Sequence, residues 1–200
     1  MIKNVIFDFG QVMVRFEPEY MVGRYVTDGE DAALLSRVIF DRALWDRLDA
    51  GTIEDSEVVL ACKSVLPERL HGAVEKIYYN WIYNLPEIPG MRELVHELKT
   101  EHGMGVFLLS NISRYFAEHR DEIPSLSEFD GCVFSAVAGF TKPSAEIFAH
   151  VCEKFSLDKE STIFVDDNEK NVKGALDFGL NAYLFDGDAV KLRDFIFKNL

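Results

Sequence analysis

A small set of polar residues follows apolar segments of the chain, at positions where a sheet protein exposes side chains to a ligand. The set consists of Asp8, Ser110, Asn111, Lys142, Asp166 and Asp167. A carboxylate such as that of Asp8 can attack phosphorus and form an aspartyl-phosphate, which splits a difficult hydrolysis into two easier steps. Because a transferred phosphoryl group carries charge on its oxygens, the remaining work is mainly positioning and electrostatic stabilisation. The residue types therefore favour phosphoryl chemistry.

The other residues of the set divide between phosphate and a cation. Lys142 supplies a fixed positive charge, and the Ser110 hydroxyl and the N–H groups of the following helix can donate to phosphate oxygens. Asp8, Asp166 and Asp167 would repel one another strongly unless a cation lay among them. Mg²⁺ fits, since it prefers a few carboxylates together with substrate phosphate and water. The sequence thus predicts a phosphate site beside a magnesium site.

Taken singly, each of these residues has an ordinary structural explanation. An Asp after an apolar run is usually a turn or a cap, and Ser110-Asn111 alone resembles a helix N-cap. Lys142 precedes Pro143, a common first helical residue, so Lys142 alone would be a solvated side chain. The joint interpretation depends on all four motifs occurring in order, each at an expected strand end or helix start.

Five apolar segments must position these residues. Four of them are continuous rather than alternating, as in strands that are covered on both faces; they comprise residues 4–9, 105–110, 162–166 and 182–185, and a weaker fifth comprises residues 132–135. Predicted helices alternate with them at residues 91–101, 114–122, 144–155, 171–178 and 189–199. This alternation predicts an α/β fold, a parallel sheet with helices on both faces. Ligands of such sheets bind at the carboxyl ends of the strands.

The segment between the first two strands has a different character. It contains no convincing strand, and amphipathic helices are predicted at residues 19–26, 31–40, 54–65 and 68–84. Thr52 and Asp55 have the spacing of a capping box at one helix start. We therefore predict an α/β core of residues 1–15 and 90–200 with an inserted α-helical cap, residues 16–89. Trp45 and Trp81 are expected mainly in the core of the cap, with some aromatic residues at a substrate entrance.

The motifs FDFGQV, LLSN, KPSAEIF and FVDDNEKN match in order and type the four motifs of the haloacid dehalogenase-like (HAD) superfamily. The chain resembles most the branch of bacterial α-D-glucose-1-phosphate phosphatase and the N-terminal phosphatase domain of soluble epoxide hydrolases. The resemblance implies a Rossmann-like core and makes Asp8 the nucleophile and a Mg²⁺ ligand. It implies that the Gly10 carbonyl and Asp167 are further ligands, with Asp166 beside them. Ser110 and Asn111 would bind phosphate, and Lys142 would bridge phosphate and Asp8.

Gly10 departs from the pattern of most superfamily phosphatases, which have a second Asp at this position as general acid and base. General acid–base catalysis typically contributes about 10²–10⁴-fold in rate. The substrate could have a good leaving group, as a sugar 1-phosphate does. The proton carrier could come from the cap, from Gln11 through water, or from the substrate. A slow phosphatase or a phosphate-binding protein is the third explanation, and we favour the first two.

The expected activity is that of a Mg²⁺-dependent phosphatase acting on a small phosphorylated metabolite, a sugar phosphate with sugar 1-phosphates preferred. A haloacid dehalogenase is one alternative, since those superfamily members also lack the second Asp. They need no Mg²⁺, however, and their fourth motif keeps no Asp pair such as Asp166-Asp167. A HAD-fold phosphate-binding or regulatory protein with weak catalysis is another alternative, against which the intact Asp8, Lys142 and Asp167 argue.

The composition of the chain limits the kinds of partner that it can be expected to bind. The formal net charge is −13 in 200 residues, which argues against nucleic acid and anionic membrane, because both need clustered Lys and Arg. No apolar run approaches the ~20 residues of a membrane span, and the first residues form a predicted strand rather than a signal peptide. Cys62, Cys132 and Cys152 lack metal-like spacing and are predicted to be reduced core thiols of a cytoplasmic protein. The sequence does not predict an oligomeric state.

Overall fold

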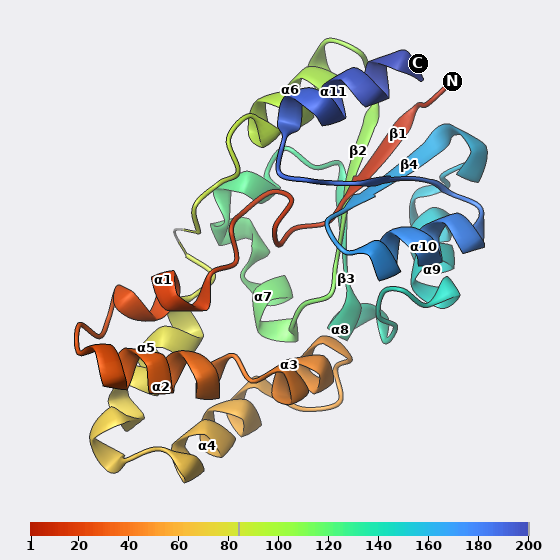
Figure 1. Ribbon diagram of the computed structural model, residues 1–200. Coiled ribbons are helices and arrows are strands. Elements are labelled where there is room, and N and C mark those ends of the chain that lie inside the picture. The colour runs from red at the N-terminus through yellow and green to blue at the C-terminus, as the bar shows by residue number, and fades with distance from the viewer. Residues whose placement is uncertain (84, 200) are drawn as a thin grey trace.

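The computed structural model describes residues 1–83 and 85–199, and its centre is a single parallel sheet (Figure 1). The strand order is β3-β2-β1-β4-β5. The strands are β1 (Asn4–Phe7), β2 (Gly105–Ser110), β3 (Gly131–Phe134), β4 (Thr162–Asp166) and β5 (Asn181–Leu184). In the register of the central strand, Val5 pairs with Val106 on one side and with Ile163 on the other. The predicted α/β fold with a parallel sheet is confirmed.

Helices cover both faces of this sheet (Figure 1). One face carries α6 (Met91–Thr100) and α11 (Ala189–Lys198), and the other carries α9 (Ala145–Phe155) and α10 (Glu169–Phe178). Alternate side chains of a strand point to opposite faces. Accordingly, Val5 and Phe7 pack in the apolar cluster that includes Leu94 and Ile196, whereas Ile6 packs with Phe148. Burial on both faces explains why the strand sequences are continuously apolar.

Five helices between β1 and α6 gather beyond the carboxyl ends of the strands (Figure 1). They are α1 (Pro18–Gly23), α2 (Gly29–Ile39), α3 (Arg42–Asp49), α4 (Asp55–Val65) and α5 (His71–Asn80). They share an apolar cluster of their own, in which Leu35, Val58, Val74 and Ile77 are fully buried. We retain residues 16–89 as the proposed extent of this cap.

The structure corrects two details of the cap. The predicted capping box of Thr52 and Asp55 is wrong, because α4 begins at Asp55 and its N-cap is Glu54. The Glu57 carboxylate accepts from the Glu54 N–H at 3.0 Å, while the Thr52 hydroxyl donates to the Arg47 carbonyl, also at 3.0 Å. Helix α3 was not predicted, because it has only eight residues, RALWDRLD, and half of them are charged.

Several helices are shorter than their sequence pattern predicts. The segment predicted at residues 68–84 is a 3-10 turn, Glu68–Leu70, followed by α5, and Asn84 lies outside the described residues. The segment predicted at residues 114–122 is α7 (Arg114–Glu118) followed by a 3-10 turn, Arg120–Glu122. Two further 3-10 turns occur at Pro124–Leu126 and Lys159–Ser161, and a short helix, α8 (Ser135–Ala138), follows β3.

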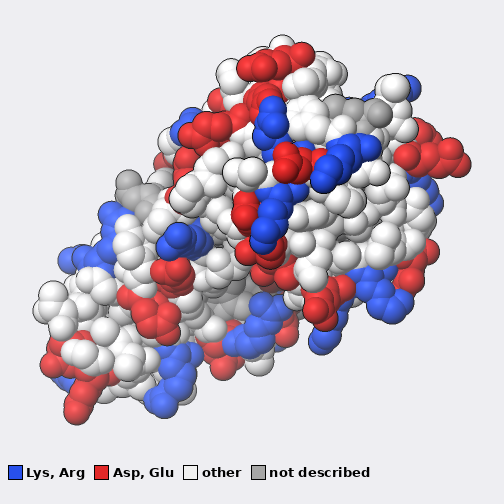
Figure 2. Space-filling model, turned by 45° about the horizontal axis from the view of Figure 1, so that its top comes forward, with Lys and Arg blue, Asp and Glu red and all other residues white. Residues whose placement is uncertain are grey.

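The two ends of the described chain lie side by side (Figure 1), and the Ile2 N–H donates to the Asn199 carbonyl at 3.1 Å. All three cysteines are buried and unpaired. Acidic and basic side chains are interspersed on the face shown in Figure 2. Within residues 1–83 and 85–199, no helix has both the length and the apolar character needed to cross a membrane.

Candidate active site

The carboxyl ends of β1, β2 and β4 meet at one cavity of about 360 Å³ between the sheet and the cap. Its walls include most of the residues predicted from the sequence: Asp8, Gly10, Ser110, Asn111, Lys142 and Asp167. Asp166, which ends β4, is fully buried behind this wall. The cap contributes a second group of lining residues, which the sequence did not single out as a set: Phe16, Arg42, Trp45, Asp49 and Trp81.

Lys142 lies at the centre of the charged residues. Its Nζ is 2.7 Å from Asp8 Oδ1 and 2.7 Å from Asp166 Oδ2, and its side chain is almost completely buried. Burial disfavours the charged amine, but the two carboxylates outweigh that effect and hold the pKa of Lys142 above its ordinary value. Lys142 is therefore a permanently charged group in direct contact with Asp8.

Asn111 holds the backbone of Lys142 in place. The Lys142 N–H donates to Asn111 Oδ1 at 2.8 Å, and Asn111 Nδ2 donates to the Lys142 carbonyl at 3.1 Å. The amide group of Asn111 thus makes two bonds to one residue. A role of this side chain in binding phosphate stays a prediction, whereas its geometry is that of a group that positions Lys142.

Asp166 is saturated by donors from the protein. Its Oδ1 accepts from the Asn168 N–H at 2.8 Å and from Asn171 Nδ2 at 3.1 Å. Its Oδ2 accepts from Lys142 at 2.7 Å and from Asn171 Nδ2 at 3.0 Å. This arrangement favours Asp166 as the residue that positions Lys142, and direct ligation of a metal by Asp166 stays a prediction. Asn171 was not singled out from the sequence, although it lies in the fourth motif.

Ser110 is buried at the end of β2 and lines the cavity. Its neighbours Ser113 and Ser135 are also buried, but their hydroxyls are used within the fold, by the Phe116 N–H and the Ile112 N–H respectively. Among the residues that the structure describes, none forms a hydrogen bond with the hydroxyl of Ser110. That hydroxyl is therefore available to a ligand, and its role in binding phosphate stays a prediction.

The donor set fits a divalent cation. One carboxylate oxygen from each of Asp8, Asp166 and Asp167 lies within 4.8 Å of the others. Burial raises the pKa of Asp8 to about 7 against the opposing effect of Lys142, and burial followed by the charge of Asp166 raises that of Asp167. These three acids thus share the ammonium group of Lys142, which leaves an excess of negative charge. Mg²⁺ prefers hard oxygen donors of this kind. The residues present fit that ion.

An aromatic wall closes the cavity on the side of the cap. The Phe16 ring lies 5.2 Å from that of Trp45 and 5.5 Å from that of Trp81, edge to face in both pairs. Trp81 stacks on Phe116 of α7 at 5.8 Å, so the wall continues into the core. Trp45 and Trp81 therefore line the cavity and join the cap to the core, rather than lying in the cap interior.

Comparison with known proteins places this arrangement in a family. The sequence pattern of the haloacid dehalogenase-like hydrolases matches residues 2–179. The chain belongs to this family. The HAD-like hydrolase is 27% identical to a sesquiterpene phosphatase of Aspergillus oryzae, over 89% of this chain and 87% of the relative. It is 25% identical to a D-ribitol-5-phosphate phosphatase of Bacteroides thetaiotaomicron, over 92% and 91% of the two chains.

Solved structures show that the fold of the HAD-like hydrolase is shared. A predicted HAD-like hydrolase of Porphyromonas gingivalis superposes with a TM-score of 0.74 at 22% identity, covering 100% of this chain and 98% of the other. A HAD family enzyme of Bacteroides thetaiotaomicron, in complex with magnesium and inorganic phosphate, superposes with a TM-score of 0.71 at 20% identity. The match covers 96% of this chain and 99% of the other. The L-2-haloacid dehalogenase of Xanthobacter autotrophicus superposes with a TM-score of 0.65 at 20% identity, covering 91% of this chain and 76% of the other.

Gly10 of the HAD-like hydrolase lies in a tight turn after β1 where a side chain would fit. A Cβ built on Gly10 would meet only the Phe16 Cβ, at 3.9 Å, which is ordinary contact. The neighbouring Gln11 adopts a φ of 58° and its side chain donates to the Phe16 carbonyl at 3.1 Å. Gln11 is therefore occupied in the turn, and space does not explain the glycine.

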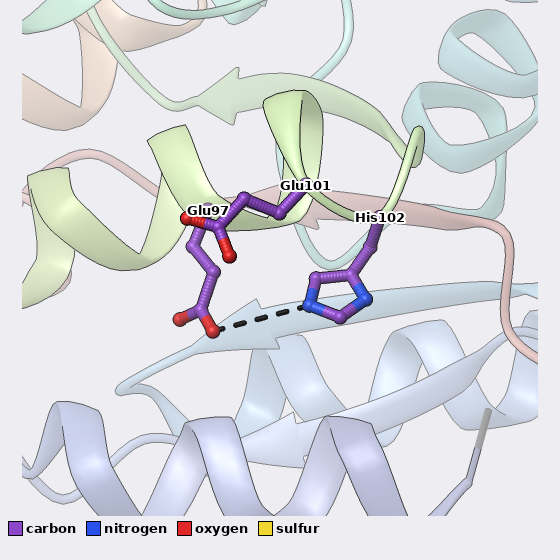
Figure 3. Close-up of side chains that lie close together, drawn as sticks. All are labelled: Glu97, Glu101 and His102. Atoms are coloured by element: carbon purple, nitrogen blue, oxygen red, sulfur yellow. Dashed lines mark ion pairs between the residues drawn. The ribbon is translucent and has the colours of Figure 1, made fainter.

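A second group of possible metal ligands lies on the opposite part of the HAD-like hydrolase. Glu97 of α6 and Glu101, the residue that follows this helix, lie beside His102 (Figure 3). His102 Nε2 is 3.9 Å from Glu97, and the Glu97 carboxylate is already held by Arg193 of α11, whose Nη2 lies 2.6 Å away. This surface group joins α6 to α11 and carries no argument for a second site.

Proposed function

We propose that the protein is a Mg²⁺-dependent phosphatase that hydrolyses a small phosphorylated metabolite through an aspartyl-phosphate on Asp8. The observation that carries the proposal is the buried contact of 2.7 Å between Asp8 and Lys142 in the cavity that Ser110 also lines. Lys142 opposes the effect of burial on Asp8, favours its ionised form for attack, and faces the phosphate charge. The two relatives described above are both phosphatases by name, which supports the same reaction class here.

Asp8, the Gly10 carbonyl and Asp167 would hold the cation, with Asp166 behind them. When bound, Mg²⁺ would neutralise part of the charge on the phosphoryl oxygens. Ser110 donates to the phosphate, and Asn111 and Asp166 keep Lys142 in position through the bonds described above. The cap excludes water from the reacting group and selects the substrate.

A sugar phosphate, with sugar 1-phosphates preferred, is the substrate class that we propose. Aromatic faces such as those of Trp45 and Trp81 suit the apolar faces of a sugar, and Arg42 and Lys170 on the same cavity offer charged partners for hydroxyls. One relative acts, by its name, on D-ribitol 5-phosphate, a sugar-alcohol phosphate. A cytoplasmic location is part of this proposal.

The central test replaces the nucleophile. We expect Asp8→Asn to abolish phosphatase activity with Mg²⁺ across a panel of phosphorylated metabolites, because an amide cannot attack phosphorus. Circular dichroism should report an unchanged fold, and Asp177→Asn, in an exposed ion pair with Lys173, serves as the control with normal turnover. Normal turnover by Asp8→Asn would contradict the assignment of the nucleophile.

Metal removal separates the proposal from dehalogenation. Chelation by EDTA should silence the enzyme and added Mg²⁺ should restore it, since the three carboxylates need a cation. Cleavage of a 2-haloacid without metal would instead favour a dehalogenase, although the acidic pair Asp166-Asp167 argues against that reaction. A wild-type protein inactive on every phosphate of the panel would favour a binding protein.

A further inference from the structure

One buried carboxylate of the cavity has no role in the chemistry proposed above. Asp49, the last residue of α3, is 7% exposed and lines the same cavity as Asp8. Its Oδ1 is buried and has no hydrogen-bond partner among the described residues. Because a buried polar atom without a partner destabilises a fold, such a position in a cavity indicates a group reserved for a ligand.

The backbone of Asp49 is fixed to Ser135, the first residue of α8, and through it to the loop that follows β2. The Ser135 hydroxyl donates to the Asp49 carbonyl at 2.6 Å and accepts from the Ile112 N–H at 2.9 Å. Ile112 is two residues beyond Ser110, which we propose as a phosphate donor. A side chain of the cap is thus held at a set place relative to the phosphate site.

A second contact brings this part of the cap close to the core. Gly51, two residues after Asp49, has a φ of +67°, and a Cβ on Gly51 would lie 2.6 Å from the Ala136 carbonyl oxygen. A glycine is required here both by conformation and by the close approach. The turn after α3 therefore lies directly on the first residues of α8.

The charges around Asp49 leave it without an ionic partner. Arg42 and Asp46 on its own helix and Lys142 from the core are the charged groups that act on it. Arg42 Nε forms its ion pair with Asp46, at 2.7 Å. Burial raises the pKa of Asp49 to about 7, so its carboxyl group can gain or lose a proton near neutral pH. A group with such a pKa is suited to give and take a proton in catalysis.

We propose that Asp49 is the general acid and base that replaces the carboxylate missing at Gly10. This inference rests on the proposed phosphatase function. It accounts for three observations together: the space left at Gly10, the engaged side chain of Gln11, and a buried, unpartnered carboxylate supplied from the opposite wall of the cavity.

The protons balance over two steps. In the first, Asp8 attacks phosphorus, the bond from phosphorus to the leaving oxygen breaks, and protonated Asp49 gives that oxygen its proton. In the second, the Asp49 carboxylate takes a proton from a water molecule while the water oxygen attacks the aspartyl-phosphate. The Asp8–phosphorus bond breaks, inorganic phosphate leaves, and Asp49 is again protonated.

The test compares Asp49→Asn with wild-type protein on phosphate esters whose leaving groups differ. On alkyl phosphates we expect kcat to fall by about 10²–10⁴-fold, the usual contribution of a general acid. On p-nitrophenyl phosphate, whose leaving group departs without a proton, the first step should survive. The variant should then release a burst of one p-nitrophenol per enzyme, followed by slow turnover, because the second step has lost its base.

A rescue experiment distinguishes proton transfer from a structural role. Gly10→Asp restores a carboxylate at the usual position, and the space around Gly10 allows it. In the Asp49→Asn background this second change should recover at least ten-fold in kcat on alkyl phosphates. Asp49→Glu should retain part of the activity. The pH–rate profile of wild type should lose activity as the pH rises through about 7, and Asp49→Asn should lack that limb.

Each result decides between definite alternatives. The absence of a burst with p-nitrophenyl phosphate, which would mean that the first step is lost on aryl as well as on alkyl esters, would overturn the proposal. A raised KM with unchanged kcat would also overturn it and would indicate a ligand for a substrate hydroxyl. A failure of Gly10→Asp to rescue would also count against it. A wild-type enzyme that is inactive on all esters overturns the phosphatase function itself. An active wild type with an unchanged Asp49→Asn profile overturns only the role of Asp49.

Discussion

Single residues of this protein carry charge in places where charge is costly. Asp49 is the clearest example, because its pKa rises from 3.8 to about 7 on burial. A group with a raised folded-state pKa stabilises the fold only while it is protonated. The contribution is complete below pH 4 and is lost as the pH rises through about 7.

This linkage predicts that Asp49→Asn stabilises the protein at pH 8, because the uncharged amide avoids a buried charge. The gain in unfolding free energy should reach a few kcal/mol, on the scale of 1.4 kcal/mol per pKa unit, and should vanish near pH 4. Urea unfolding at pH 4, 6 and 8 measures it. Asp46→Asn, on the same helix but exposed, is the control and should show little pH dependence. A constant difference between Asp49→Asn and wild type across this pH range would contradict the assigned burial of charge.

At the scale of elements, the position of Lys142 depends on how the loop before α9 rests on α10. Asn111 holds the backbone of Lys142, and Pro143 lies against Gly174 of α10. A Cβ on Gly174 would lie 2.5 Å from the Pro143 carbonyl oxygen, and backbone atoms would have to shift. The small residue in α10 is therefore a condition for the contact between Lys142 and Asp8.

We expect Gly174→Ala to lower kcat at least ten-fold and to destabilise the protein by about 1–3 kcal/mol, the usual cost of overpacking. Gly72→Ala is the matched control, because Gly72 lies in α5 with no atom within 4 Å of a built Cβ. That change should be neutral or stabilising by up to ~1 kcal/mol through helix propensity. Activity assays and thermal unfolding check both variants. Equal behaviour of the two alanine variants would contradict the proposed packing constraint.

At the scale of the whole molecule, the sequence predicts the sheet and its strand ends well, because continuous apolar segments indicate strands buried on both faces. It predicts the residues at those ends for the same reason. It does not predict α3, which is only eight residues long and half charged. It also does not assign a role to Asp49, because tertiary contacts hold that residue at the cavity. Ser135 of the core binds the Asp49 carbonyl, and Gly51 of the cap lies against Ala136 of the core. Tertiary contacts of this kind leave no local pattern.

The aromatic wall has a practical consequence for the whole chain. Trp45 and Trp81 are its only tryptophans, and both line the cavity. Intrinsic fluorescence excited at the indole band should therefore report on the cavity. Inorganic phosphate with Mg²⁺ should change the emission with a saturable dependence, and Trp45→Phe should retain a smaller signal from Trp81. If calorimetry shows that a ligand binds and the emission does not change, the placement of the two tryptophans at the cavity is contradicted. The protein thus contains its own optical probe of occupancy, and ligands can be ranked by titration without a label or a turnover assay.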